Sequence, residues 1–253
     1  MRAGLFYVVL LCLAGLARPA AAFGGETDNA SQYKACLQLI EVNPLSALDA
    51  AQYWGGTGGG AAAQHCRAAA LFSLRRFRDA AEIYERLASS PNPDASLPAR
   101  VELLAQGGKA YLLAGQPQKS VILLTTAILQ APDRVDIRQD RAVAYITLKN
   151  YSGVLEDLNS VLAVTPNAVD ALIFRATAWR MLQSYAPANA DIAKALALDP
   201  SRQEAYLERG LLKAAGGDIT GARTDWEYVI RLNPQSVVAN AAQQNLNKVA
   251  AGQ

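Results

Sequence analysis

The chain alternates amphipathic stretches with short polar breaks between residues 101 and 234. Within each stretch of about 12 to 15 residues, hydrophobic side chains recur every three or four positions, the spacing of one face of an α-helix. Successive stretches pair around breaks that are rich in turn-forming residues: Gly115-Gln116, Lys149-Asn150, Gln183-Ser184 and Gly216-Gly217-Asp218. Two helical stretches joined by such a turn predict a helical hairpin, so this part of the chain is expected to be all-α.

The hairpins repeat with a period of 34 residues, which is marked by Pro132, Pro166, Pro200 and Pro234. Four units align when position 1 is assigned to Val101, Val135, Val169 and Gln203. Proline then stands at position 32 of every unit. Because proline cannot continue a helical hydrogen-bond ladder, each one is expected to stop the second helix of its unit.

Residue size also follows the period. Position 8 is always small: Gly108, Ala142, Ala176 and Gly210. Position 20 is occupied by Ser120, Val154, Ala188 and Ala222. Position 24 is large: Leu124, Leu158, Ile192 and Trp226. Small residues at positions 8 and 20 allow the two helices of a hairpin to approach closely, and large residues at positions 4, 11 and 24 fill the space between them.

The units resemble tetratricopeptide repeats, which have a large residue at position 4, glycine at 8, tyrosine at 11, alanine at 20 and 27, an aromatic at 24 and proline at 32. The segments 107–111 (GGKAY) and 196–200 (LALDP) are typical of that family. Arg138 at position 4 and Lys213 at position 11 depart from its pattern. The resemblance implies an α-solenoid in which stacked hairpins form a right-handed superhelix. The units are 101–134, 135–168, 169–202 and 203–234.

The pattern extends beyond these four units in both directions. Residues 61–100 are interpreted as a divergent unit whose enlarged loop, Pro91 to Pro98, lengthens the spacing to 40 residues. Residues 23–60 are interpreted as a degenerate N-terminal hairpin that ends in a flexible glycine-rich turn at Gly55 to Gly60. Residues 235–253 are expected to form a C-terminal capping helix and tail, because their asparagines and glutamines would give the solenoid a polar end.

A pair of opposite charges accompanies the last three units. Position 7 is Arg141, Arg175 and Arg209, and position 23 is Asp157, Asp191 and Asp225. The unit at 101–134 has neither charge, with Gly107 and Leu123 at these positions. Joint presence and joint absence indicate a salt bridge inside each hairpin, worth about 1 kcal/mol or less if it is exposed. Independent charges on solvated faces are the alternative.

The first 22 residues have the pattern of a cleavable signal peptide. A basic residue, Arg2, precedes an apolar run from Leu5 to Leu16, and Ala20 to Ala22 supply the small residues of a cleavage site after Ala22. An uncleaved anchor is the alternative. We therefore expect a periplasmic or secreted protein. No later apolar run has membrane-spanning length, so no membrane insertion is expected after cleavage.

Charge argues against nucleic acid as a partner. The whole chain has 24 basic and 22 acidic residues, and the expected cleavage removes Arg2 and Arg18. The mature protein would then have no net charge and no global field to attract an anionic polymer.

Two cysteines remain in the expected mature chain, Cys36 and Cys66. The solenoid architecture makes the first and third helices neighbours, and export implies an oxidising compartment, so we predict a disulfide between them. A metal site made of Cys36, His65 and Cys66 is a weaker alternative, because successive helical residues point about 100° apart. His65 is then expected to be a partly exposed polar residue on a groove wall.

No catalytic pattern is evident, and we predict neither an enzyme nor a cofactor. His65 is the single histidine of the chain, and no serine or acid is placed by motif to act with it. Gly55 to Gly60 lacks the Lys-Ser/Thr ending of a phosphate-binding loop.

The resemblance also implies a concave groove lined by positions 2, 5, 9 and 12 of the first helix in each unit. These residues are Glu102, Ala105, Lys109, Leu112, Asp136, Gln139, Val143, Ile146, Asp170, Ile173, Thr177, Arg180, Glu204, Leu207, Leu211 and Ala214. The row combines an apolar floor with one acidic position per unit. It is suited to a peptide or helix that has apolar anchors and basic flanks. Alternatively, the acids serve only the positive ends of their own helices.

The predicted function is a non-enzymatic scaffold of the cell envelope that binds a segment of a partner protein in this groove. The alternative is an accessory or small-ligand protein that binds glycans of cell-wall metabolism. The aromatic residues Trp179, Trp226 and Tyr145 argue against glycan binding, because they fall at the packing positions 11 and 24.

Overall fold

The computed structural model describes residues 25–91 and 98–251, and every regular element in these ranges is a helix. The expected signal peptide (1–22) and most of the expected enlarged loop (92–97) lie outside the described residues. No helix in the described part combines the length and the apolar composition that crossing a membrane requires.

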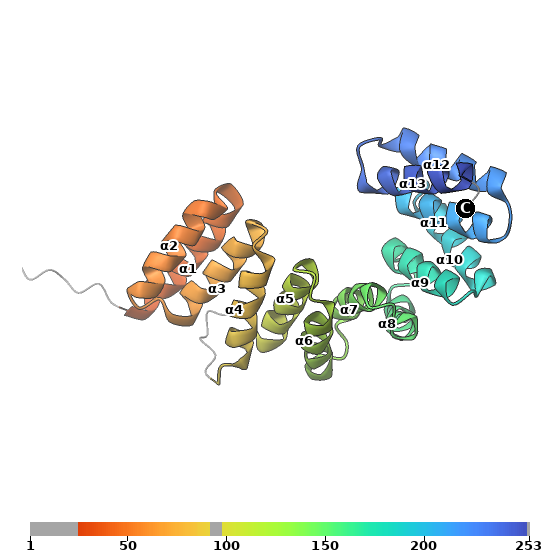
Figure 1. Ribbon diagram of the computed structural model, residues 1–253. Helices are drawn as coiled ribbons and strands as arrows, with labels where there is room; N and C mark the ends of the chain where they lie inside the picture. The colour runs from red at the N-terminus through yellow and green to blue at the C-terminus, as the bar shows by residue number, and fades with distance from the viewer. Residues whose placement is uncertain (1–24, 92–97, 252–253) are drawn as a thin grey trace, which may run out of the picture.

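Six helical hairpins follow one another along a curved path, and a single helix ends the stack (Figure 1). In each hairpin we call the first helix A and the second helix B. The N-terminal hairpins are α1 (Gly25–Val42) with α2 (Pro44–Gly56), α3 (Gly60–Ser73) with α4 (Phe77–Ser89), and α5 (Arg100–Leu113) with α6 (Pro117–Gln130). The next are α7 (Val135–Thr147) with α8 (Tyr151–Val164), α9 (Val169–Met181) with α10 (Tyr185–Leu198), and α11 (Gln203–Ala215) with α12 (Ile219–Leu232), followed by α13 (Val237–Ala250). The predicted all-α solenoid of helical hairpins is confirmed.

The turns inside the hairpins share one backbone conformation. Position 15 has a positive φ in five units, at Arg75, Gly115, Lys149, Gln183 and Gly217. The next residue donates its N–H to the carbonyl of position 11 each time, as Gln116 does to Tyr111 at 2.9 Å. This is a Schellman-type helix ending, in which a left-handed residue reverses the chain. Arg75 takes the same place as the others, so the unit that begins at Ala61 shares the register of its neighbours.

Close packing within a hairpin depends on the small residue at position 8. A Cβ added to Gly108 would lie 2.6 Å from Leu124, and a Cβ added to Gly210 would collide with Trp226. Positions 8 and 24 are therefore in direct contact, and the small residue at position 8 permits the close approach that the sequence predicted. Larger residues at position 8 would force the two helices apart.

The interior is divided into four clusters of buried residues. One extends from Ala47 to Ile137 and a second from Ala142 to Leu212, so the two meet within α7. A third surrounds Cys36, Trp54 and Cys66, and a fourth surrounds Trp226 near the C-terminus. Each hairpin thus depends mainly on its sequence neighbours, as is usual in solenoids.

All three predicted Arg–Asp pairs are present, and each arginine donates two hydrogen bonds to its aspartate. The Nε and Nη2 distances are 2.8 and 2.7 Å for Arg141–Asp157 and again for Arg175–Asp191. They are 2.9 and 2.6 Å for the pair at Arg209. The condition of exposure is not met, because the aspartates are at most 7% exposed. Their arginines lie over them and exclude solvent, so breaking one pair costs more than an exposed bridge would.

The two residues that depart from the repeat pattern support these pairs. Arg138 places Nη1 3.6 Å from a carboxylate oxygen of Asp157, and Lys213 places Nζ 2.8 Å from Asp225. Both cations replace large packing residues beside a buried carboxylate. They therefore add positive charge where a negative charge has been removed from water.

The glycine-rich segment contains a tight turn that backbone hydrogen bonds close. Thr57 and Gly59 both donate their N–H groups to the carbonyl of Trp54, at 3.0 and 2.9 Å. A Cβ added to Gly59 would lie 2.6 Å from the Trp54 indole. The glycine therefore allows the tryptophan to pack closely against the backbone.

The last helix, α13, closes the C-terminal end. Ala239 and Ala242 are buried against the preceding hairpin, whereas Asn240, Gln243, Gln244 and Asn247 are exposed. This polar outer face cannot bury a further repeat without leaving amide groups unpaired.

Candidate functional site

A cavity of about 550 Å³ lies between the A helices of the N-terminal half. The backbones of α3 and α5 approach each other less closely there than those of the other successive A helices. Its lining residues are Leu37, Ile40, Glu41, Ala69, Phe72, Ser73, Tyr84, Glu102, Ala105, Gln106, Lys109, Arg134, Asp136 and Asp140. They come from α1, α3, α4, α5 and α7 and from the turn before α7.

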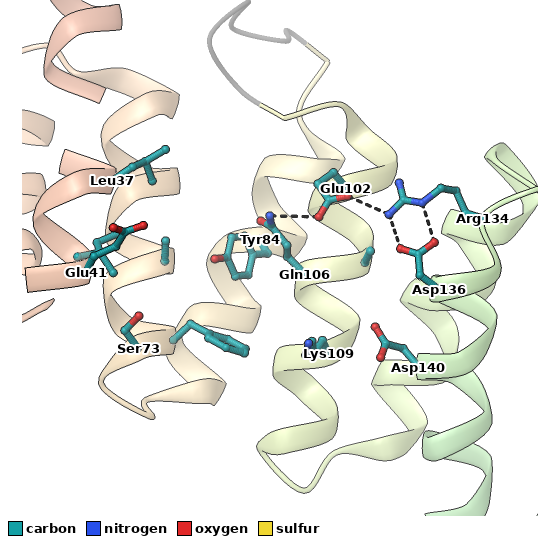
Figure 2. A pocket seen from close by; sticks show the side chains of 14 residues that line it. Leu37, Glu41, Ser73, Tyr84, Glu102, Gln106, Lys109, Arg134, Asp136 and Asp140 are labelled. Carbon is teal, nitrogen blue, oxygen red and sulfur yellow. Dashed lines mark hydrogen bonds and ion pairs between the residues drawn. The ribbon is translucent and has the colours of Figure 1, made fainter. Parts of the chain in front are cut away.

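One wall of the cavity is mainly apolar. It consists of Leu37 and Ile40 on α1 and of Ala69 and Phe72 on α3. Glu41 stands at its edge, and its side chain is exposed (Figure 2). Four apolar side chains in one concave surface can bury the apolar side chains of a ligand.

The opposite wall is charged and comes from α5 and α7. Arg134 joins two acids: it donates to Glu102 at 3.2 Å and to Asp136 at 2.8 and 2.6 Å (Figure 2). Its hydrogen bond holds the pKa of Asp136 below the ordinary value, although burial acts in the opposite direction. This acid–arginine–acid group connects two successive A helices.

Lys109 and Asp140 face each other on the same wall without an ion-pair contact (Figure 2). Burial raises the pKa of Asp140, the charge of Lys109 partly opposes the increase, and Asp136 and Glu102 add to it. The carboxylate of Asp140 is therefore less well compensated than those of the aspartates inside the hairpins.

A chain of hydrogen bonds runs along one side of the cavity. The Tyr33 hydroxyl lies 2.8 Å from Nδ1 of His65, and Nε2 of His65 lies 3.0 Å from Oε1 of Gln106. Gln106 in turn donates Nε2 to Glu102 at 3.4 Å. Because this bond presents the Gln106 oxygen to the imidazole, Nε2 of His65 carries the proton and Nδ1 accepts from Tyr33. The chain links α1, α3 and α5.

His65 is therefore a buried residue, and the expectation that it is partly exposed was wrong. Its side chain is only 4% exposed, and its ring packs against those of Tyr33 and Tyr84. Burial lowers its pKa below the ordinary value of 6.5, although Gln106 and Glu102 act in the opposite direction. The neutral imidazole serves as a connector between helices.

The predicted disulfide between Cys36 and Cys66 is present, with their Cα atoms 6.3 Å apart. Cys36 precedes Leu37 on α1, and Cys66 follows His65 on α3. The bond therefore fixes the helix that supplies much of the apolar wall to the helix beside it. Among the described residues, no group of three or more histidine, cysteine or acidic side chains is arranged to hold a metal ion.

Four of the predicted groove residues line the cavity: Glu102, Ala105, Lys109 and Asp136. The cavity does not include the other members of that row: Leu112, Gln139, Val143, Ile146, Asp170, Ile173, Thr177, Arg180, Glu204, Leu207, Leu211 and Ala214. Several of these have structural partners instead. Arg180 pairs with the buried Glu208 at 2.5 Å, and Leu207 and Leu211 pack against the C-terminal cluster.

The acids at position 2 are all paired with arginines. Arg202 contacts Asp170 at 2.5 Å and Glu204 at 2.8 Å, which repeats the arrangement of Arg134. Both arginines stand at position 34, directly before the next A helix. The two arginines, each shared by two acids, therefore neutralise half of the acidic row within the protein itself.

The apolar wall was not predicted from the sequence, although part of its signal was available there. Ala69 and Phe72 are positions 9 and 12 of the unit that begins at Ala61, so the same groove rule applied there would have identified them. Gln106 and Asp140 are at position 6, which the rule does not include. Leu37, Ile40 and Glu41 belong to the degenerate hairpin, where no reliable register could be assigned.

No protein-family model and no curated protein matches the chain. Solved structures are similar in fold. One is YrrB, described as a TPR protein with an unusual peptide-binding site, at 15% identity and a TM-score of 0.59 over 69% of this chain and 88% of that chain.

Two further solved structures are similar. MamA (41-end) from Desulfovibrio magneticus RS-1 matches at 17% identity and a TM-score of 0.56 over 83% of this chain and 98% of its own. TTC0263, a thermophilic TPR protein in Thermus thermophilus, matches at 17% identity and a TM-score of 0.57 over 74% of this chain and 99% of its own. Together they show that this chain has the tetratricopeptide-repeat fold.

Proposed function

We propose that this chain, which has the fold of a tetratricopeptide-repeat protein, is a non-enzymatic scaffold of the cell envelope that binds a segment of another protein. The segment lies in the concave groove, and its principal contact is the cavity between α1, α3, α5 and α7. The observation that carries the proposal is the 550 Å³ cavity, whose lining combines an apolar wall with a charged wall. This combination can hold an apolar anchor and orient it by charge.

Neither His65, which lies beside the cavity, nor Arg134, which lines it, is arranged for catalysis. His65 is buried and has hydrogen-bond partners at both ring nitrogens, so it has no free nitrogen for proton transfer to a ligand. Arg134 is committed to two acids. Catalytic acids and bases must reach the reacting group directly.

Export to the periplasm or the exterior is part of the proposal. The signal-peptide pattern of residues 1–22 motivates it. The disulfide between Cys36 and Cys66 supports it, because such bonds persist in oxidising compartments. The scaffold would then act in that compartment.

Glycan binding is supported less well. Sugar-binding sites rely on exposed aromatic faces, but Trp54 and Trp226 are buried and Trp179 packs against the central cluster. The cavity offers Phe72 and Tyr84, of which Tyr84 is buried.

The proposal is tested by replacing an exposed residue at the edge of the cavity with a larger one that blocks it. Ser73 lines the cavity and is exposed, so Ser73→Trp should fill part of the space without disturbing the fold. Gln118→Trp on the exposed surface of α6 is the matched control, because it adds the same indole outside the cavity.

Both variants and the wild type are cross-linked in the envelope fraction and recovered. We expect a defined partner to be recovered with the wild type and with Gln118→Trp, and to be lost with Ser73→Trp. Equal recovery with all three proteins would move the binding surface away from the cavity. Recovery of a glycan instead of a protein would favour the accessory role.

A further inference from the structure

We propose that the occupant of the cavity is a protein segment that combines apolar side chains with lysine or arginine, and that Lys109 opposes its binding. This inference rests on the proposed function and specifies the chemistry of the partner. It is based on the apolar wall of the cavity, on the net charge of the lining residues and on the lining charges that have no ion-pair partner.

The apolar wall sets the first requirement. Leu37, Ile40 and Phe72 are half-buried and line one side of the cavity. Apolar side chains of a partner would remove the remaining exposed surface of these residues from water. A purely polar ligand would leave that surface without a counterpart.

The balance of charge sets the second requirement. The lining includes four carboxylates, Glu41, Glu102, Asp136 and Asp140, but two cations, Lys109 and Arg134. The cavity therefore has a formal charge of −2. Arg134 neutralises only one of the two acids that it contacts, so the group of three keeps one negative charge.

Two carboxylates are left for a ligand, one on each side of the cavity. Glu41 is exposed on α1 and has no ion-pair partner among the described residues. Asp140 on α7 is half-buried, and no cation lies within ion-pair distance of it in the described part of the chain. A cationic side chain that extends from an apolar anchor would reach a region bordered by both carboxylates (Figure 2).

The charge of Lys109 distinguishes a basic ligand from an acidic one. It is the one lining cation, among the residues that the structure describes, that is outside an ion pair. A basic ligand would be repelled by Lys109, whereas an acidic ligand would depend on it. Removing its charge should therefore strengthen binding of a basic segment and weaken binding of an acidic one.

The probes are three fluorescein-labelled peptides of equal length that share the same leucines and differ only at their polar positions. These positions are lysine in the first peptide, glutamine in the second and glutamate in the third. Dissociation constants are measured by fluorescence anisotropy at low and at high salt. We expect the lysine peptide to bind most tightly and to lose much of its advantage at high salt, because salt screens exposed charges.

The protein variants neutralise one charge at a time. Glu41→Gln and Asp140→Asn should each weaken binding of the lysine peptide about 2- to 5-fold, the range of a partly exposed charge pair. Lys109→Met should strengthen it about 3-fold, by the same reasoning. Glu227→Gln, an exposed acid on α12, is the matched control and should change nothing.

The outcomes separate this inference from the proposed function. Equal binding of the three peptides, tighter binding of the glutamate peptide, or weaker binding by Lys109→Met would overturn the basic-ligand chemistry and leave the cavity as a binding site. Absence of binding by any peptide at millimolar concentration would also overturn it. If Ser73→Trp binds the lysine peptide as well as the wild type does, the cavity itself is excluded.

Discussion

The salt bridge between Arg141 and Asp157 provides the sharpest test of how the hairpins are held together. Asp157 is fully buried, and its carboxylate receives two hydrogen bonds from Arg141, at 2.8 and 2.7 Å. Arg141→Ala would leave this carboxylate in the interior with only Arg138, 3.6 Å away, to compensate it. Loss of one partner of a buried ion pair costs about 3–5 kcal/mol. We expect about 3 kcal/mol, because Arg138 can move closer.

One unit of the chain has uncharged residues at the two positions that Arg141 and Asp157 occupy. The unit at 101–134 has Gly107 and Leu123 there, and a Cβ on Gly107 would lie 3.0 Å from the leucine side chain. The double variant Arg141→Ala/Asp157→Leu imitates this arrangement and removes both charges. It should be destabilised by no more than about 1–2 kcal/mol, because a buried ion pair is worth little more than a well-packed apolar pair. The coupling between the two substitutions should then reach about 2 kcal/mol or more.

Urea unfolding followed by circular dichroism gives the free energies. Hydrogen exchange in α7 and α8 is measured in parallel, because repeats of a solenoid can unfold separately. The matched control is the exposed pair Arg76–Asp79, whose side chains are 57% and 45% exposed. There the coupling should stay below about 1 kcal/mol. Additive losses at Arg141 and Asp157, or a coupling no larger than in the control, would refute the argument from burial.

Three further predictions follow from single features of the fold. Replacing Cys36 and Cys66 with serine should lower the free energy of unfolding by roughly 3–4 kcal/mol on the chain-entropy model, seen as a lower Tm under oxidising conditions and no difference from the reduced wild type. The pKa of His65 is lowered in the folded state, so the unfolded chain takes up its proton first as the pH falls below 6.5. Stability should therefore decline from pH 7 to pH 5 in the wild type, and a His65→Gln variant with the same pH dependence would contradict this. At the left-handed turn position, Gly115→Ala should cost about 1 kcal/mol and Gln183→Gly should be neutral or stabilising by up to about 1 kcal/mol, whereas the opposite order in thermal melts would count against the turn geometry.

The periodic features could be predicted because they depend on neighbours along the chain. Pro132 and its equivalents stand two residues beyond the last helical residue, and the two helices approach closely at Gly108, as its size predicted. The pairing of position 7 with position 23 was also detectable, because both positions change together from unit to unit. The burial of these pairs was not, since it depends on the side chains that cover them from the adjacent hairpin. Thr125, for example, accepts a further hydrogen bond from Arg141 across that boundary.

The candidate site could be predicted only in part. The repeat register predicts four lining residues: Glu102, Ala105, Lys109 and Asp136. Leu37 belongs to a degenerate hairpin in which the repeat register can no longer be recognised. Registers predict which face of a helix a residue occupies. They do not predict how far two successive hairpins separate, and the wide spacing of α3 and α5 is what opens the cavity.

The sequence by itself determined the hairpins, their period of 34 residues, the closely packed positions and the charge pairs within the last three units. These depend on contacts between residues near one another in the chain, where helical periodicity fixes the geometry. The tertiary structure decided where the stack opens, that His65 connects three helices through Tyr33 and Gln106, and that the acids at position 2 already have arginine partners. Such contacts depend on the relative placement of whole hairpins. That placement is a sum of many small packing terms and leaves no periodic pattern in the sequence.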